Sequence, residues 1–320
     1  MKRFLSLFLV VLNLCILFVS CDKKHEHVFS ETWKSNTACH WHDCACGATQ
    51  DVGTHDYSSD GNCKICKGSI FAGEFISVPF DQAYDFSENL TSAGKKFVFS
   101  SGYQMNLKTE LQGVQVSEGA KTTFKQELIW NVFVSENETG LIAYATCNSA
   151  RTYDGGLLSD VLQYEAWYQG SYVFMQEKNV LNNETVKYKE QKTFDEFLYE
   201  YIRLSESMFD MTMMMQVFNG GFYHDIRASY CNDVGYEKYR IDVPAQTKEN
   251  VTNELSVSFV FDEETRLISS KYYSVMKVEL SDSLPEGEGI SETINTVIIV
   301  PYSGGVNSLS DPGSFPDKAA

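Results

Sequence analysis

Residues able to bind a metal are concentrated in one short stretch of this chain, between His25 and Cys66. The stretch holds five of the six histidines and five of the nine cysteines. These ten residues are His25, His27, Cys39, His40, His42, Cys44, Cys46, His55, Cys63 and Cys66. The surrounding sequence is polar and has too few aliphatic residues to build a core, so it needs a metal or disulfides in order to fold. We therefore predict a small cross-linked module over residues 22–70.

Two cysteine pairs predict that this module binds zinc. Cys44-x-Cys46 and Cys63-x-x-Cys66 can each present two thiolates from one tight turn, and Zn²⁺ takes four such ligands tetrahedrally. The expected core site is Cys44, Cys46, Cys63 and Cys66. A histidine can replace one cysteine, because ten candidates exceed the ligands needed by even two ions. All five histidines therefore remain candidate ligands: His25, His27, His40, His42 and His55.

Other chemistry competes with zinc for these cysteines. An exported module lies in an oxidising environment, where the two pairs can form disulfides and leave Cys39 as an odd thiol. Disulfides alone do not explain the two His-x-His pairs. A c-type haem site requires histidine directly after Cys-x-x-Cys, but Lys67 follows Cys66. Zinc remains the preferred cofactor. Whether one or two ions bind, and whether they are structural or labile, is left open.

The N-terminus predicts export and a lipid anchor. Lys2 and Arg3 precede an apolar stretch over residues 4–19, which is typical of a signal peptide. Residues 17–21, Leu-Phe-Val-Ser-Cys, resemble a bacterial lipobox, although Phe18 occupies the position where leucine is usual. The resemblance implies that residues 1–21 are a lipoprotein signal peptide and that acylated Cys21 begins the mature protein. The alternatives are ordinary signal cleavage and an uncleaved anchor.

The module also resembles a short Cys/His module that recurs in bacterial surface proteins and lipoproteins. The resemblance rests on the histidine pairs, on Trp33, on the run from His40 to Cys46 and on the closing Cys63-x-x-Cys66. It implies a surface location: the extracytoplasmic face of the cell membrane, reached through the lipid anchor. Removal of the leader takes the formal net charge from -17 to -19. Because a chain with this net negative charge repels the phosphate backbone of nucleic acids, no nucleic-acid partner is expected.

The rest of the chain, residues 71–302, predicts a sheet-rich binding domain. Long aromatic and β-branched runs read as strands of a curved antiparallel sheet. The predicted strands cover 96–103, 104–116, 121–134, 139–147, 160–177, 185–192, 236–243, 254–261, 266–279 and 292–300. A polar turn at 262–265 predicts a hairpin between 259–261 and the strand that begins at Arg266. Residues 303–320 are expected to form a flexible tail.

One helix is predicted within the strands, over residues 194–218. Thr193 and Glu196 fit a capping box, and Asn219-Gly-Gly ends the apolar pattern. Flexible methionines in its second half suit an adaptable site for an apolar or lipid-like ligand. They are Met208, Met211, Met214 and Met215. The alternative is that they only fill the space under the sheet, which leaves a structural or interaction scaffold.

Together these patterns predict an α+β fold, in which the helix covers the sheet. The strand run with its inserted helix and the hairpin at 259–268 are similar to the lipoprotein-carrier (LolA-like) fold, and in that family the space between sheet and helices accepts acyl chains. No pair of carboxylates or nucleophile with a base stands out in this domain, so no catalytic residue is expected. Surface handling of zinc by the Cys/His module is the competing function.

Overall fold

The computed structural model describes residues 26–79, 100–154, 156–204, 225–281, 283–306 and 308–318. The described chain forms two compact units, which are treated separately below. The small unit comprises residues 26–35 and 39–54. The large unit comprises residues 36–38 and the described residues from His55 onward. The boundary thus falls inside the Cys/His stretch, and His55, Cys63 and Cys66 belong to the unit that contains the large sheet.

The small unit is a three-stranded antiparallel sheet in the order β1 (Lys34–Ser35), β2 (Cys39–Asp43) and β3 (Thr49–Thr54). Trp33 packs against two of its histidines. The Trp33 ring lies 4.7 Å from the ring of His40, edge to face, and 3.9 Å from that of His42. His40 and His42 are two residues apart on one strand and so share a face of it. The small unit therefore uses its histidine pair partly as core.

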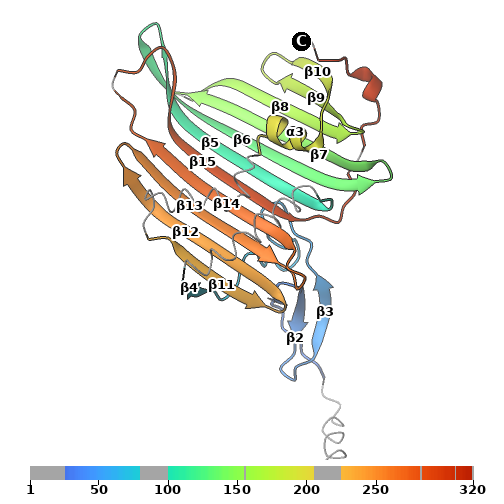
Figure 1. The fold of residues 1–320 in the computed structure, drawn as a ribbon. Helices are drawn as coiled ribbons and strands as arrows, with labels where there is room; N and C mark the ends of the chain where they lie inside the picture. The colour runs from blue at the N-terminus through green and yellow to red at the C-terminus, as the bar shows by residue number, and fades with distance from the viewer. Residues whose placement is uncertain are drawn as a thin grey trace, which may run out of the picture. The chain divides into compact units, whose positions relative to one another are not determined.

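The large unit is built on one twelve-stranded antiparallel sheet (Figure 1). Its order is β10-β9-β8-β7-β6-β5-β15-β14-β13-β12-β11-β4. Two meanders, β5 to β10 and β11 to β15, join where β5 pairs with β15. The strands are β4 (Ile76–Val78), β5 (Tyr103–Ser117), β6 (Ala120–Asn137), β7 (Gly140–Tyr153), β8 (Leu157–Gln169), β9 (Tyr172–Asn179), β10 (Glu184–Gln191), β11 (Arg227–Asp233), β12 (Tyr236–Lys248), β13 (Val251–Phe261), β14 (Leu267–Val278) and β15 (Gly287–Pro301).

In the middle of this sheet, buried side chains pack on both faces, as strand β15 shows. Successive side chains of a strand point to opposite faces. Val297 and Ile299 pack in a cluster with β5 to β9, whereas Ile298 and Val300 pack with residues of the segment 57–71. All four side chains are buried, which explains why the sequence there is a continuous apolar run and not an alternating one.

The predicted α+β fold with a covering helix is wrong. The capping box at Thr193 is present, but it starts only α3 (Phe194–Glu196) and one π-helical turn, η1 (Phe197–Tyr201). Arg203 then adopts a left-handed φ of 61°, and the Leu204 N–H bonds to the Leu198 carbonyl oxygen, which closes the turn. The rest of the predicted helix, residues 205–218, lies outside the described residues. The described fold is antiparallel sheet with only this short helical segment and a single 3-10 turn, η4 (Pro312–Ser314), so the LolA-like arrangement does not hold.

Local features of the sheet match the sequence more closely. The hairpin predicted at 262–265 is confirmed, because β13 pairs with β14 and Asp262 Oδ1 accepts the N–H groups of Glu264 and Arg266. The predicted strand 160–177 is instead two strands, since Gly170 and Ser171 take left-handed conformations and form a turn between β8 and β9.

No helix in the described parts of the chain is long and apolar enough to cross a membrane.

The C-terminal segment, expected to be a flexible tail, lies along the sheet where it is described. Asp317 bridges to Lys189 of β10 in a parallel arrangement, so the segment covers part of that edge strand. Phe315 is buried between Trp167 and Phe174. The buried Phe315 side chain anchors the segment. The sequence did not predict this, because the many Gly, Pro and Ser residues around it are typical of a flexible tail.

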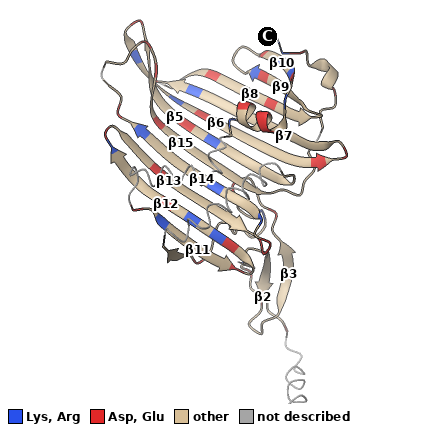
Figure 2. Cartoon of the chain, viewed as in Figure 1, with Lys and Arg blue, Asp and Glu red and all other residues tan. Residues whose placement is uncertain are grey.

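Charged residues are scattered along the strands (Figure 2), and some are paired across neighbouring strands. Lys108 bonds Glu127 on β6 at 2.8 Å, and Lys277 of β14 bonds Glu292 on β15 at 2.8 Å. These pairs are partly exposed, so each contributes little stability, on the order of 0–1 kcal/mol. Their main consequence is that many of the few basic groups face acidic neighbours.

Candidate metal centre

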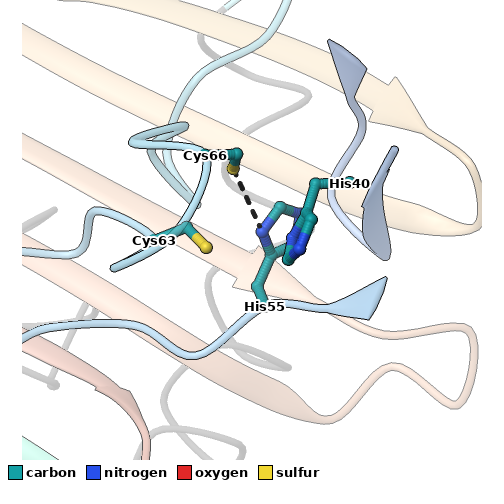
Figure 3. A group of neighbouring side chains, drawn as sticks. All are labelled: His40, His55, Cys63 and Cys66. Atoms are coloured by element: carbon teal, nitrogen blue, oxygen red, sulfur yellow. Dashed lines mark hydrogen bonds between the residues drawn. The ribbon is translucent and has the colours of Figure 1, made fainter. Parts of the chain in front are cut away.

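A group of three ligands forms in the large unit from His55, Cys63 and Cys66. Their candidate ligand atoms all lie within 4.8 Å of one another. His55 Nδ1 lies 3.6 Å from Cys66 Sγ, the contact drawn as a dashed line in Figure 3, where His40 is drawn as well. In a tetrahedral zinc site with Zn–S of 2.3 Å and Zn–N near 2.05 Å, the N···S edge is about 3.6 Å. The spacing therefore suits a shared zinc ion.

The turn between Cys63 and Gly68 positions both thiols. The Cys63 N–H bonds to the Gly68 carbonyl oxygen at 2.8 Å, and the Lys67 N–H bonds to the Cys63 carbonyl oxygen at 3.0 Å. Lys67 has a φ of 64°, which turns the chain so that the Gly68 N–H points back at Cys66 Sγ, 3.4 Å away. Backbone N–H groups that donate to sulfur stabilise the thiolate, the form that binds a metal.

One hydrogen bond fixes the tautomer of His55. Its Nε2 lies 2.8 Å from the backbone carbonyl oxygen of Asn36, which can only accept. Nε2 therefore carries the proton, and the lone pair of Nδ1 is left facing Cys66. A metal-binding histidine is usually held by this kind of bond from its other nitrogen. The imidazole is thus pre-oriented as a ligand.

The two thiols of the turn differ in acidity. Burial acts to raise the pKa of Cys63, but hydrogen bonds to its sulfur, including those from the backbone N–H groups of Ile65 and Cys66, outweigh it and lower the pKa to about 6. Burial raises the pKa of Cys66, against the opposing bond from the Gly68 N–H. One thiol of the pair is therefore readily ionised near neutral pH, as zinc binding requires.

The segment that carries these ligands is docked on the sheet by apolar contacts. We call residues 55–72 the zinc loop, after the metal that we propose for it below. Cys63, Ile70 and Phe71 are buried in one cluster with Val260 of β13 and Ile298 and Val300 of β15. Gln104 of β5 also donates from Nε2 to the backbone oxygen of Tyr57 at 2.6 Å. The zinc loop therefore forms part of the core on one face of the large sheet.

A second anchor holds residues 36–38, which carry the carbonyl that orients His55. Both the N–H and the hydroxyl of Thr37 donate to Asp233 Oδ2, at 2.8 and 2.5 Å. Lys238, only 2 % exposed, lies 3.8 Å from the same carboxylate and bonds to the Ala72 carbonyl oxygen. Burial lowers the pKa of Lys238, and Asp233 opposes that shift. One carboxylate at the end of β11 thus ties the Asn36 carbonyl to the sheet.

Replacing Thr37 with Val tests this anchor. The change removes a buried hydrogen bond to a charged group at nearly constant volume, so the unfolding free energy should fall by about 1.5–3 kcal/mol. Urea denaturation measures it. Thr247→Val is the matched control, because Thr247 is exposed and should change stability by less than about 0.5 kcal/mol. Equal effects of the two changes would show that Asp233 does not anchor residue 37.

The other cysteine pair takes part in a separate group, in the small unit. His27, Cys44 and Cys46 have ligand atoms within 4.8 Å of one another. Within each unit, one cysteine pair lies beside a histidine. The expected site of four cysteines draws on both units and stays a prediction. Sequence spacing identified the ligand types and the two pairs, but it could not assign a histidine to each.

The other histidines and cysteines of the chain, and the predicted ligand-binding methionines, are not part of these two groups or lie outside the described residues. His40 is buried in β2, where a Cβ on Gly53 would come within 3.1 Å of its Nε2, and His42 stacks on Trp33 with its Nδ1 buried and unpartnered. No disulfide joins the cysteines of the described chain, Cys39, Cys147 and Cys231 included. Outside the described residues lie Cys21, His25, Met208, Met211, Met214 and Met215. The acylation and apolar-ligand predictions that rest on those residues therefore stay predictions.

Comparison with known proteins yields little for this chain. No protein-family model matches it, and no curated protein matches it. Among solved structures it is similar to a DUF1329 family protein from Desulfovibrio piger ATCC 29098, at 14% identity over 73% of this chain and 95% of that one, with a TM-score of 0.23. It is also similar to the translocator domain of the autotransporter NalP from Neisseria meningitidis, at 7% identity over 69% of this chain and 96% of that one, with a TM-score of 0.20. A third similar structure is the transport unit of the autotransporter AIDA-I from Escherichia coli, at 10% identity over 68% of this chain and 99% of that one, with a TM-score of 0.17. TM-scores this low do not establish a shared fold, so the description of the chain rests on its own strand pairing and its own Cys/His groups.

Proposed function

We propose that this protein is a zinc-binding protein of the bacterial cell surface. One zinc ion, held by His55, Cys63 and Cys66, fixes the zinc loop to the large sheet. The observation that carries the proposal is the His55 imidazole, whose Nε2 donates to Asn36 while Nδ1 faces a thiol at the N···S spacing of a tetrahedral zinc site. The bound ion thereby links residues 36–38, the Cys63–Gly68 turn and the core.

Zinc suits this group better than the other common metals. Two thiolates with an imidazole are soft to borderline ligands, which disfavours Mg²⁺ and Ca²⁺. His55, Cys63 and Cys66 supply three of the four ligands that a structural zinc ion takes.

Elemental analysis of the purified protein tests the proposal. We expect at least one zinc ion per chain, and we expect a strong chelator to remove it and to make the thiols of Cys63 and Cys66 reactive toward a thiol reagent. Protein that carries no zinc after reconstitution, or in which these two cysteines form a disulfide, would contradict the metal site. Mass spectrometry of the alkylated protein separates those two outcomes.

The surface location rests on the lipid anchor, for which Cys21→Ala is the test. We expect this variant to stay unprocessed or to be released from membranes, because the acylated side chain is gone. Acyl chains supply about 0.8 kcal/mol per buried methylene, and two or more chains hold a protein stably on a bilayer. Cys15→Ala is the matched control: it removes the other leader cysteine and should leave processing unchanged. Membrane fractionation with mass spectrometry of the N-terminus gives the result.

A further inference from the structure

The small unit contains a second set of metal ligands that the zinc loop does not use. His27 Nδ1 lies 3.2 Å from Cys46 Sγ, and the Sγ atoms of Cys46 and Cys44 lie 3.3 Å apart. Two thiols and an imidazole nitrogen thus converge on one point. The S···S separation is far above the bond length of a disulfide, about 2.05 Å. The cluster is therefore arranged as a ligand set and not as a cross-link.

Backbone geometry within the small unit builds this set. The Gly47 N–H bonds to the Cys44 carbonyl oxygen and the Cys44 N–H to the Ala48 carbonyl oxygen, both at 2.8 Å, so residues 44–48 close a tight turn. Gly47 adopts a φ of 88°, which favours glycine. A bridge between Phe29 and Cys44 brings the chain that carries His27 alongside the turn. Local backbone pairing thus brings the three ligands together.

The two groups differ in their exposure to solvent. Cys63 is fully buried, whereas His27 and Cys46 are exposed and Cys44 is half-buried. Among the residues that the structure describes, no fourth Cys, His or carboxylate joins His27, Cys44 and Cys46. Sites with three protein ligands leave one position of the zinc ion to water or to an incoming group, whereas closed sites do not.

We propose that His27, Cys44 and Cys46 form an exchangeable zinc site, which takes up an ion from solution and yields it to a competing ligand. The inference deepens the proposed function and rests on its choice of zinc. An incoming thiolate or imidazole occupies the open position first, and the protein ligands leave afterwards, so the ion remains Zn²⁺ throughout. Uptake releases the protons of the two thiols, and transfer returns them.

Competition with a chromogenic zinc chelator tests the proposal on the full chain. Zinc-loaded protein should release two equivalents in two phases, with the first phase faster by about tenfold or more because solvent reaches that ion. Cys46→Ser and His27→Ala should each abolish the fast phase and keep the slow one. Cys63→Ser should abolish the slow phase alone. Cys39→Ser, a cysteine of neither group, is the matched control and should keep both.

Each other outcome has a distinct meaning. A single slow equivalent that Cys46→Ser does not change would overturn the exposed site and leave the zinc-loop proposal intact. Two equivalents released at equal rates would overturn exchangeability. Protein that binds no zinc at all would overturn both proposals together. Circular dichroism of the His27→Ala and Cys46→Ser variants confirms that the loss of a phase does not come from unfolding.

Discussion

Replacing Cys63 with Ser is expected to remove the buried zinc ion and to release the zinc loop from the sheet. Structural zinc binding is worth about 10–16 kcal/mol at neutral pH, and loss of a thiolate ligand forfeits much of it. Cys63 is also fully buried beside Ile70 and Phe71, so the change disturbs the cluster on β13 and β15. We expect zinc affinity to fall by more than about 100-fold, beyond the effect of losing an outer-shell partner.

Limited proteolysis with elemental analysis measures this result. Lys64 and Lys67 lie in the zinc loop, so trypsin should cut the Cys63→Ser variant there and spare the parent chain. Cys39→Ser should behave like the parent, because Cys39 belongs to neither ligand group. If Cys63→Ser retained its full zinc content and remained resistant to trypsin, the metal site would have to be assigned to other residues.

Replacing Phe197 with Ala is expected to be the most destabilising single change in the core of the large unit. The side chain is fully buried at the start of η1, with ring centres 5.8 Å from Tyr168 and 6.0 Å from Phe194. Removing a buried phenylalanine costs about 3–5 kcal/mol through lost burial and the cavity that remains. We expect the unfolding free energy to fall by that amount in urea denaturation, with a lower melting temperature.

Leu158→Ala is the control for this change. Its side chain is 47 % exposed on β8, so the substitution should alter stability by less than about 0.5 kcal/mol. Should Phe197→Ala cost under about 1 kcal/mol, the helical segment would contribute little to the core and the cluster described around it would be incorrect.

The sheet could be predicted from sequence where pattern and turn chemistry agree. The hairpin at Asp262 has both, and β13 and β14 pair as expected. Strand β11 (Arg227–Asp233) was not predicted, because only Ala228 and Cys231 are buried and the run has no strong alternation of apolar residues. Its pairing with β12 and β4 supplies what its own sequence lacks.

The predicted helix shows the opposite error: strand β11 was missed, whereas the helix was predicted to be longer than it is. Local signals at Thr193 are strong, and the cap forms as predicted. The pattern predicted a helix that continues beyond the cap, whereas the chain turns at Arg203, so that Ile202 and Leu204 join Phe197 and Leu198 in the core. Contacts with distant strands, which periodicity does not encode, decided the length of this segment.

By itself the sequence determined that the long β-branched runs would form antiparallel strands, and it predicts that the Cys/His stretch with its two thiol pairs needs a cross-link. Those conclusions follow from local composition and spacing. The tertiary structure alone decided that each thiol pair lies beside a histidine of its own unit, and that the loop carrying Cys63 and Cys66 is docked on β13 and β15. The physical reason is that a ligand set is completed by residues brought together through backbone pairing and burial, such as the Asn36 carbonyl behind His55, and no spacing along the chain records those contacts.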